Sequence, residues 1–324
     1  MSTISIRPFS LVLLTISLFP AVIARPSRGQ SSSNEVQAYL GRWDLTLKAP
    51  DREYPSWLEL RQDGGKLTAQ MVGRWGNARP LPTVELSDGT LTFVSPKEEE
   101  ASKRDMVFEG KLVGRHLEGT VAAPDGTSWA WVGNPAPSLK RTKDPTWGEP
   151  IELFNGKDLS GWKTDKTDPQ KMWTAVHGTL VSPGHGPELI NDRKFQDFKL
   201  HVEFNCGAGA NSGIYLRGRY EVQIEDNSIQ EPPSHHTGGI YGFIAPSPEQ
   251  PRKPGTWQSF DITLVGRRVT VVQNGHVIID QQEIPGITGG ALDSHEELPG
   301  PIYLQGSEDG QVAFRNIVIS PAKE

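Results

Sequence analysis

The stretch Asn211-Ser-Gly-Ile-Tyr-Leu-Arg-Gly-Arg-Tyr-Glu-Val-Gln-Ile-Glu-Asp226 decides the fold class, because its side chains alternate with a period of two. Apolar residues fall on one face and polar or aromatic residues on the other, which is typical of a β-strand with one face in a core. Gly218 predicts a tight hairpin within the stretch. The apolar face comprises Ile214, Leu216, Tyr220, Val222 and Ile224, and the polar face comprises Tyr215, Arg217, Arg219, Glu221, Gln223 and Glu225.

The polar face has an unusual composition for a solvated strand. It combines a phenol ring, guanidinium groups, carboxylates and a carboxamide, which are planar donors and acceptors suited to sugar hydroxyls. An exposed strand laced with salt bridges is the alternative interpretation. We favour a ligand-binding face, and therefore expect these side chains to surround a shared hollow.

Other segments of the chain repeat the same alternation, so the sequence predicts an all-β protein. Residues 148–321 carry many alternating runs and the hairpin signal Asn274-Gly275, which predicts two packed antiparallel sheets. Residues 36–135 carry short runs separated by Asp-Gly pairs, which predict a small antiparallel barrel or half-barrel. Residues 136–147 are rich in Pro and Lys and are expected to link the two halves.

The start of the chain resembles an export signal. Residues 1–24 combine a basic start at Arg7 with a short apolar run, which predicts a cleaved signal peptide, and residues 25–35 are expected to be a linker. The mature protein is therefore expected to be periplasmic or secreted, and an uncleaved membrane anchor is the alternative interpretation of this segment.

Composition excludes several function classes. The formal net charge of -6 and the lack of a basic run argue against nucleic acid as a partner. The single cysteine, Cys206, excludes an intrachain disulfide framework and a thiolate zinc cluster.

The hairpin and several later motifs resemble the 3-keto-disaccharide hydrolase domain family. The resemblance covers about residues 150–321, and its motifs occur in order along the chain. It implies a concanavalin A-like jelly roll that acts on glycosides. The matching segments are Leu153–Trp162, Asn211–Arg217, Tyr220–Asp226, Gly238–Tyr241, Pro254–Trp257, Asn274-Gly275, Gly300–Gln305 and Phe314–Ile317.

The resemblance implies a reaction on a sugar that is already oxidised at C3. A base would remove the C2 proton, the aglycone would leave from C1, and water would add to the resulting alkene. We expect Glu221 to be the base, Arg217 and Gln223 to clamp the enediolate oxygen, and Asp226 or a histidine such as His236 to be the acid. A divalent metal such as calcium could replace the clamp.

Further residues are expected to bind the substrate. The resemblance places Gln305 and Arg315 at the edge of the same cleft, although Arg315 could instead lock the last strand. One departure is that Gly306–Gly310 lacks the family's His-Gly pair, for which Glu308, Asp309 or His295 could compensate. The remaining predicted substrate-binding residues are Asn211, Tyr215 and Tyr241.

Three functions compete at this point. The first is an exported enzyme that cleaves 3-keto-glycosides, supplied by a separate glycoside 3-dehydrogenase. The second is a carbohydrate-binding protein without catalysis, because one fold can host either activity. The third is a structural module built from two β domains. The first domain shows no acid/base constellation, and positioning, substrate binding or shielding of the cleft are its candidate tasks.

Overall fold

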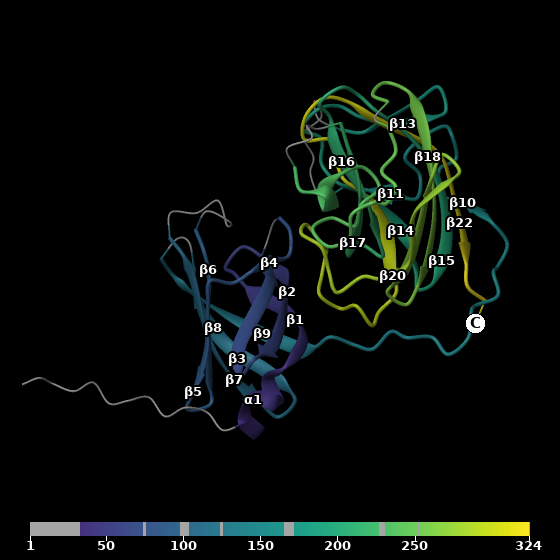
Figure 1. The fold of residues 1–324 in the computed structure, drawn as a ribbon. Helices are drawn as coiled ribbons and strands as arrows, with labels where there is room; N and C mark the ends of the chain where they lie inside the picture. Colours follow the sequence, from purple (N-terminus) through teal and green to yellow (C-terminus); the bar gives the residue numbers. More distant parts are fainter. Residues whose placement is uncertain are drawn as a thin grey trace, which may run out of the picture.

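The structure is a computed structural model that describes residues 33–73, 76–97, 104–123, 126–164, 172–226, 231–251 and 253–323. The chain forms an N-terminal sheet and a C-terminal sandwich (Figure 1). Each of them has a hydrophobic core. The predicted signal peptide lies outside the described residues. The predicted linker 25–35 overlaps a helix, α1, which begins at Ser33 and ends at Tyr39.

The N-terminal sheet is an antiparallel meander of nine strands that curls on itself. Its order is β4-β3-β2-β1-β9-β8-β7-β6-β5, and β3 approaches β5, so the sheet nearly closes into the predicted barrel. Its strands are β1 (Gly41–Lys48), β2 (Glu53–Asp63), β3 (Lys66–Val72), β4 (Arg79–Pro80), β5 (Thr83–Ser87), β6 (Thr90–Ser95), β7 (Met106–Val113), β8 (His116–Ala122) and β9 (Ser128–Pro135).

The C-terminal half is a sandwich of two antiparallel sheets, which confirms the predicted jelly-roll class. The larger sheet contains β10 (Ile151–Glu152), β12 (Thr174–Val176), β13 (Thr179–Ser182), β15 (Phe198–Cys206), β18 (Trp257–Val265), β19 (Arg268–Gln273), β20 (His276–Glu283) and β22 (Val312–Pro321). The smaller sheet contains β11 (Trp162–Lys163), β14 (Leu189–Phe195), β16 (Asn211–Leu216), β17 (Tyr220–Glu225) and β21 (Gly300–Leu304). A short 3₁₀ turn, η1 (Pro233–His235), follows β17.

The decisive stretch forms the β16–β17 hairpin of the smaller sheet. Its apolar face lies in the sandwich core, where Ile214, Val222 and Ile224 are fully buried. Every residue of β17 is buried, its polar face included, which contradicts the alternative of an exposed strand laced with salt bridges. The N-terminal sheet and the loops after β17 and β20 cover that face.

The two halves of the chain pack against each other. Trp57 of β2 is fully buried, belongs to the core of the C-terminal sandwich, and meets the Phe243 ring edge-on at 5.3 Å between centroids. Arg42 forms an ion pair with Glu283 across the same interface at 3.1 Å. Figure 1 shows the N-terminal sheet beside the side of the sandwich that carries β17.

Candidate active site

A hollow of about 480 Å³ lies over the polar face of the β16–β17 hairpin. Its floor comes from β16, β17 and β21 of the smaller sheet, and one wall comes from the N-terminal sheet. Six residues predicted from sequence line it: Asn211, Tyr215, Glu221, Gln223, Tyr241 and Gln305. Residues of the N-terminal half that line it are Arg52, Glu53, Tyr54, Pro55 and Gly76.

Glu221 is a buried carboxyl group on the floor of the hollow, with 4% of its surface exposed. The pKa of this carboxyl group is raised to about 8: burial is the main cause, a hydrogen bond from Tyr215 opposes it, and the nearby charges of Glu308 and Glu225 add to it. Room for the carboxyl exists because Gly213, the cross-strand partner of Gln223 and a diagonal neighbour of Glu221, has no side chain: a Cβ there would lie 2.1 Å from Oε1 of Glu221. The group can therefore accept or release a proton near neutral pH.

Two stacked tyrosines position this carboxyl. The rings of Tyr215 and Tyr303 lie 4.2 Å apart and nearly parallel, because the two residues pair across β16 and β21. The Tyr215 hydroxyl lies 2.9 Å from Oε2 of Glu221 and 2.8 Å from the carbonyl oxygen of Gly289. One hydroxyl group can donate a full hydrogen bond to only one acceptor at a time. When Glu221 is protonated, the Tyr215 hydroxyl is therefore expected to donate to the carbonyl oxygen of Gly289 instead.

Carboxamides and carboxylates form a belt beside Glu221. Gln223 donates from Nε2 to Asn211 at 3.3 Å and to Glu225 at 2.9 Å, and Asn211 donates to Glu308 at 3.3 Å. Oε1 of Gln223 and Oε1 of Gln305 are buried and receive no hydrogen bond from the described residues. These two oxygens are available acceptors for ligand hydroxyl groups, since buried polar atoms normally have partners.

Glu308 lies in the hollow at the segment where the family's His-Gly pair is missing. Burial, followed by the charges of Asp309 and Glu225, raises the pKa of its carboxyl group. Of the three residues expected to compensate for that pair, Glu308 is the one that lines the hollow, and His295 instead faces Glu297 at 3.6 Å. The structure therefore brings two carboxyl groups with raised pKa values, Glu221 and Glu308, into one hollow.

Arg217, predicted to clamp the substrate, points away from the hollow. It sits in the hairpin turn with a φ of 54°, which breaks the alternation of the flanking strands. Its guanidinium group is fully buried and donates to the Tyr220 hydroxyl at 2.8 Å and to the Gly266 carbonyl at 3.1 Å. The clamp prediction for Arg217 is therefore wrong.

Three other predicted residues also lie outside the hollow. Arg315 stacks over Trp257 on the larger sheet and pairs with Glu203 at 2.6 Å, which is the strand-locking alternative. Asp226 accepts a hydrogen bond from the Gly209 amide at the far end of β17. His236 faces Glu249 at 3.0 Å and does not line the hollow.

The sequence pattern gave no separate signal for Tyr303, Glu188 and the residues of β2 as site residues. Tyr303 could have been found, because it is two positions from Gln305 and a strand places such residues on one face. The start of β2 and the hairpin line the same hollow although they are far apart in the chain, so no local pattern reports this neighbourhood.

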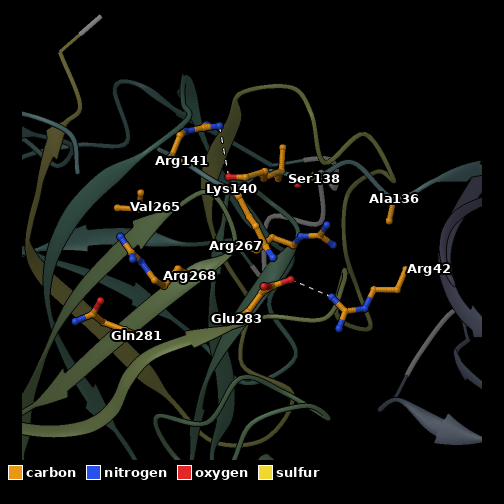
Figure 2. Close-up of a pocket in the computed structure, with 11 residues that line it drawn as sticks. Arg42, Ala136, Ser138, Lys140, Arg141, Val265, Arg267, Arg268, Gln281 and Glu283 are labelled. Carbon is orange, nitrogen blue, oxygen red and sulfur yellow. Dashed lines mark hydrogen bonds and ion pairs between the residues drawn. The ribbon is translucent and has the colours of Figure 1, made fainter. Parts of the chain in front are cut away.

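A second hollow, of about 520 Å³, lies between the segment after β9, β1 and the β18–β20 strands (Figure 2). Figure 2 shows the Arg42–Glu283 ion pair spanning it. Its other arginines also contact carboxylates, so we assign it to packing between the halves. These pairs are Arg141 with Asp197, Arg267 with Glu296 and Arg268 with Asp144.

Among the residues that the structure describes, no group of three or more His, Cys, Asp or Glu side chains is arranged to hold a metal ion. No helix in the described part of the chain has the length and apolar character needed to cross a membrane.

Comparison with known proteins agrees with the resemblance noted from the motifs. A curated 3-keto-disaccharide hydrolase of Bacteroides thetaiotaomicron is 23% identical over 167 residues, which are 40% of this chain and 57% of that protein. The chain thus spans a little over half the length of this relative. Among solved structures, a provisionally assigned glycosyl hydrolase from Parabacteroides distasonis is 28% identical, with a TM-score of 0.44 over 56% of this chain and 92% of that one. A carbohydrate-binding module from Bacillus subtilis is 11% identical, with a TM-score of 0.33 over 50% of this chain and 96% of that one.

The protein is thus a β-sandwich with a polar hollow over one sheet and a buried carboxyl group on the floor of that hollow. Residues 149–320, more than half of the chain, match the 3-keto-alpha-glucoside-1,2-lyase-like domain family. The chain belongs to this family, which confirms the resemblance.

Proposed function

We propose that the protein cleaves 3-keto-glycosides at C1, with Glu221 as the base that removes the C2 proton. The observation that carries this proposal is the buried Glu221 carboxyl group, whose pKa is raised to about 8, on the floor of a hollow lined with amides and phenols. A base is most effective when its pKa lies near the working pH. Membership of the lyase-like family supports the same chemistry.

The proposed reaction has two stages. The C3 ketone acidifies the C2 hydrogen, Glu221 takes that proton, and the electron pair forms an enediolate across C2 and C3. Collapse of the enediolate restores the ketone, forms the C1=C2 double bond and breaks the C1–O bond, so the aglycone leaves with one added proton. Addition of water across C1=C2 then yields the free 3-keto sugar.

Glu308 is our candidate for the proton donor to the leaving oxygen. Its raised pKa favours the protonated form, and its position in the hollow brings it close to the charge of Glu221. The Tyr241 hydroxyl, which donates to none of the described residues and whose pKa is raised by burial, is our candidate donor to the enediolate oxygen.

The test uses two chromogenic substrates that differ only at C3: 4-nitrophenyl 3-keto-α-glucoside and 4-nitrophenyl α-glucoside. We expect turnover of the keto substrate alone, a primary isotope effect from deuterium at C2, and a loss of at least ~100-fold in kcat for Glu221→Gln. Asp226→Asn is the matched control, since it removes a carboxylate just beyond β17 but outside the hollow.

Equal turnover of both glucosides would instead favour ordinary hydrolysis by two carboxylates, Glu221 and Glu308. Tight binding of the keto sugar by the wild type without turnover would favour the carbohydrate-binding alternative.

Two further parts of the proposal concern the setting of the reaction. A separate glycoside 3-dehydrogenase would supply the ketone, because the proposed reaction consumes a sugar that is already oxidised. We also propose export, with cleavage of the chain after about residue 24; N-terminal sequencing of the mature protein tests it.

A further inference from the structure

The start of strand β2 forms a wall of the hollow that faces the hairpin floor. Arg52 and Glu53 are exposed side chains at this wall, and Tyr54 beside them is buried. The floor residues Glu221 and Gln223 belong to the other half of the chain. The hollow therefore has this wall only while the two halves are packed together.

The wall is held firmly against the floor. Trp57 lies three residues beyond Tyr54 on the same strand, about 10 Å along it, and is buried in the core of the sandwich. Gly286 accommodates its indole, because a Cβ there would lie 2.2 Å from the ring. At the rim, Gly289 approaches the backbone of Gly76 so closely that a Cβ would lie 2.4 Å from its carbonyl oxygen.

The chemistry of the wall suits a ligand rich in hydroxyl groups. The guanidinium carbon of Arg52 lies 4.6 Å from the centre of the Tyr54 ring, and Tyr54 in turn stacks on Trp129 with ring centroids 6.2 Å apart. The Tyr54 hydroxyl donates to Asp51 at 2.7 Å, which fixes the ring. The Tyr54 ring thus packs against the guanidinium group of Arg52 at the edge of the hollow.

The charges around the hollow make Arg52 distinctive. Among the described residues that line the hollow, Arg52 carries the single basic side chain of the Lys or Arg type. The acidic lining residues are Glu53, Glu188, Glu221 and Glu308. A guanidinium beside a carboxylate offers both donors and acceptors to vicinal hydroxyl groups. A flat apolar ring could stack on the guanidinium group but would form none of these hydrogen bonds.

We propose that Arg52 and Glu53, at the start of β2, form the subsite for the leaving group, and that they select a second sugar ring over an aromatic aglycone. The inference rests on the proposed function, because it assumes that the keto sugar occupies the floor beside Glu221. The hollow of about 480 Å³ then leaves room for the leaving group at the β2 wall.

The test compares two substrates of one enzyme: a 3-keto-glucosyl-glucose disaccharide and 4-nitrophenyl 3-keto-α-glucoside. For Arg52→Ala we expect kcat/KM to fall about 10- to 100-fold on the disaccharide and less than about 3-fold on the aryl glucoside, as lost hydrogen bonds from a charged group predict. Arg52→Lys should recover only part of the loss, since an ammonium group lacks the planar fork.

Arg61→Ala is the matched control, because Arg61 lies on the same strand, is 54% exposed and pairs with Glu59 away from the hollow. Thermal unfolding of each variant checks that the chain is folded. An equal loss on both substrates, or no loss on either, overturns the subsite while leaving the proposed function intact.

Failure of the wild type to cleave either compound would overturn the proposed function instead. Calorimetric titration of the disaccharide into wild type and Arg52→Ala then decides the subsite: weaker binding by the variant supports it, and equal affinity or no binding overturns it.

Discussion

At the scale of single residues, the chemistry of the site depends on how the protein holds the proton of Glu221. Burial disfavours the charged carboxylate, and the Tyr215 hydroxyl partly restores it. Neighbouring Glu308 adds a like charge that favours protonation. The balance leaves a carboxyl group with a pKa of about 8, more basic than an exposed glutamate.

The pH profile of the reaction should report this group. Because the base must be deprotonated, we expect kcat/KM to rise with pH and to level off above about 8. Tyr215→Phe removes the bond that lowers the pKa, so the rising limb should move to higher pH. Glu308→Gln removes a repelling charge, so the limb should move to lower pH, although the loss of the proposed acid should also reduce kcat. A limb that falls with pH near 8 and is retained in Glu308→Gln would assign Glu221 the role of acid.

At the scale of elements, the β16–β17 hairpin builds the site because its two faces have separate tasks. One face is sealed into the sandwich core, and the other presents Tyr215, Glu221 and Gln223 from adjacent strands. The absence of a side chain at Gly213 leaves the space that the Glu221 carboxyl occupies.

Gly213→Ala should displace the Glu221 carboxyl, since the new Cβ would lie 2.1 Å from Oε1. We expect kcat/KM to fall at least about 10-fold and the free energy of unfolding to fall by about 1–3 kcal/mol, as in overpacked cores. Chemical denaturation of a double-mutant cycle with Glu221→Asp checks the cause. The shorter side chain should relieve the clash, so additive effects on unfolding would contradict it.

Sequence patterns predicted the floor of the site well and its surroundings poorly. Period-two alternation placed Glu221, Gln223 and Tyr215 on one face, and the structure has them in one hollow. The prediction for Arg217 failed because alternation holds only while φ stays extended, and this residue has a φ of 54° in the turn. Motif order alone suggested Arg315, which an ion pair holds on the other sheet.

At the scale of the whole molecule, the interface between the halves contains a buried carboxyl pair. Asp44 of β1 is 2% exposed, and burial raises its pKa to about 9, with further contributions from Glu296 and Glu297 against the opposing charge of Arg267. Glu296 also accepts hydrogen bonds from Tyr220 and Arg267. The folded protein thus keeps a proton on Asp44 that the unfolded chain releases above its ordinary pKa of 3.8.

This proton should make the stability of the protein fall as pH rises. The folded state binds the proton more tightly, so its contribution is complete below about pH 4 and is lost progressively towards pH 9. Asp44→Asn replaces the carboxyl group by an amide of the same shape that does not titrate. Between pH 5 and 9, the Tm of this variant should therefore fall several degrees less than the Tm of the wild type. Circular dichroism melts at a series of pH values measure this. Parallel curves for the two proteins would show that Asp44 does not titrate in this range.

The residues that form the wall of the hollow could not be predicted from the sequence, for a physical reason. Hydrophobic alternation identified β2 as a strand, but no local signal says which distant element a strand will pack against. Arg52 and Glu53 look like ordinary surface residues until Trp57 anchors their strand in the sandwich.

The indole of Trp57 has a consequence for how the chain can be divided. Producing the sandwich without the N-terminal half would remove the Trp57 indole from its core. The apolar surface around Phe243 and Gly286 would then be exposed to water. We therefore expect residues 149–320 to be less stable alone than together with the N-terminal sheet.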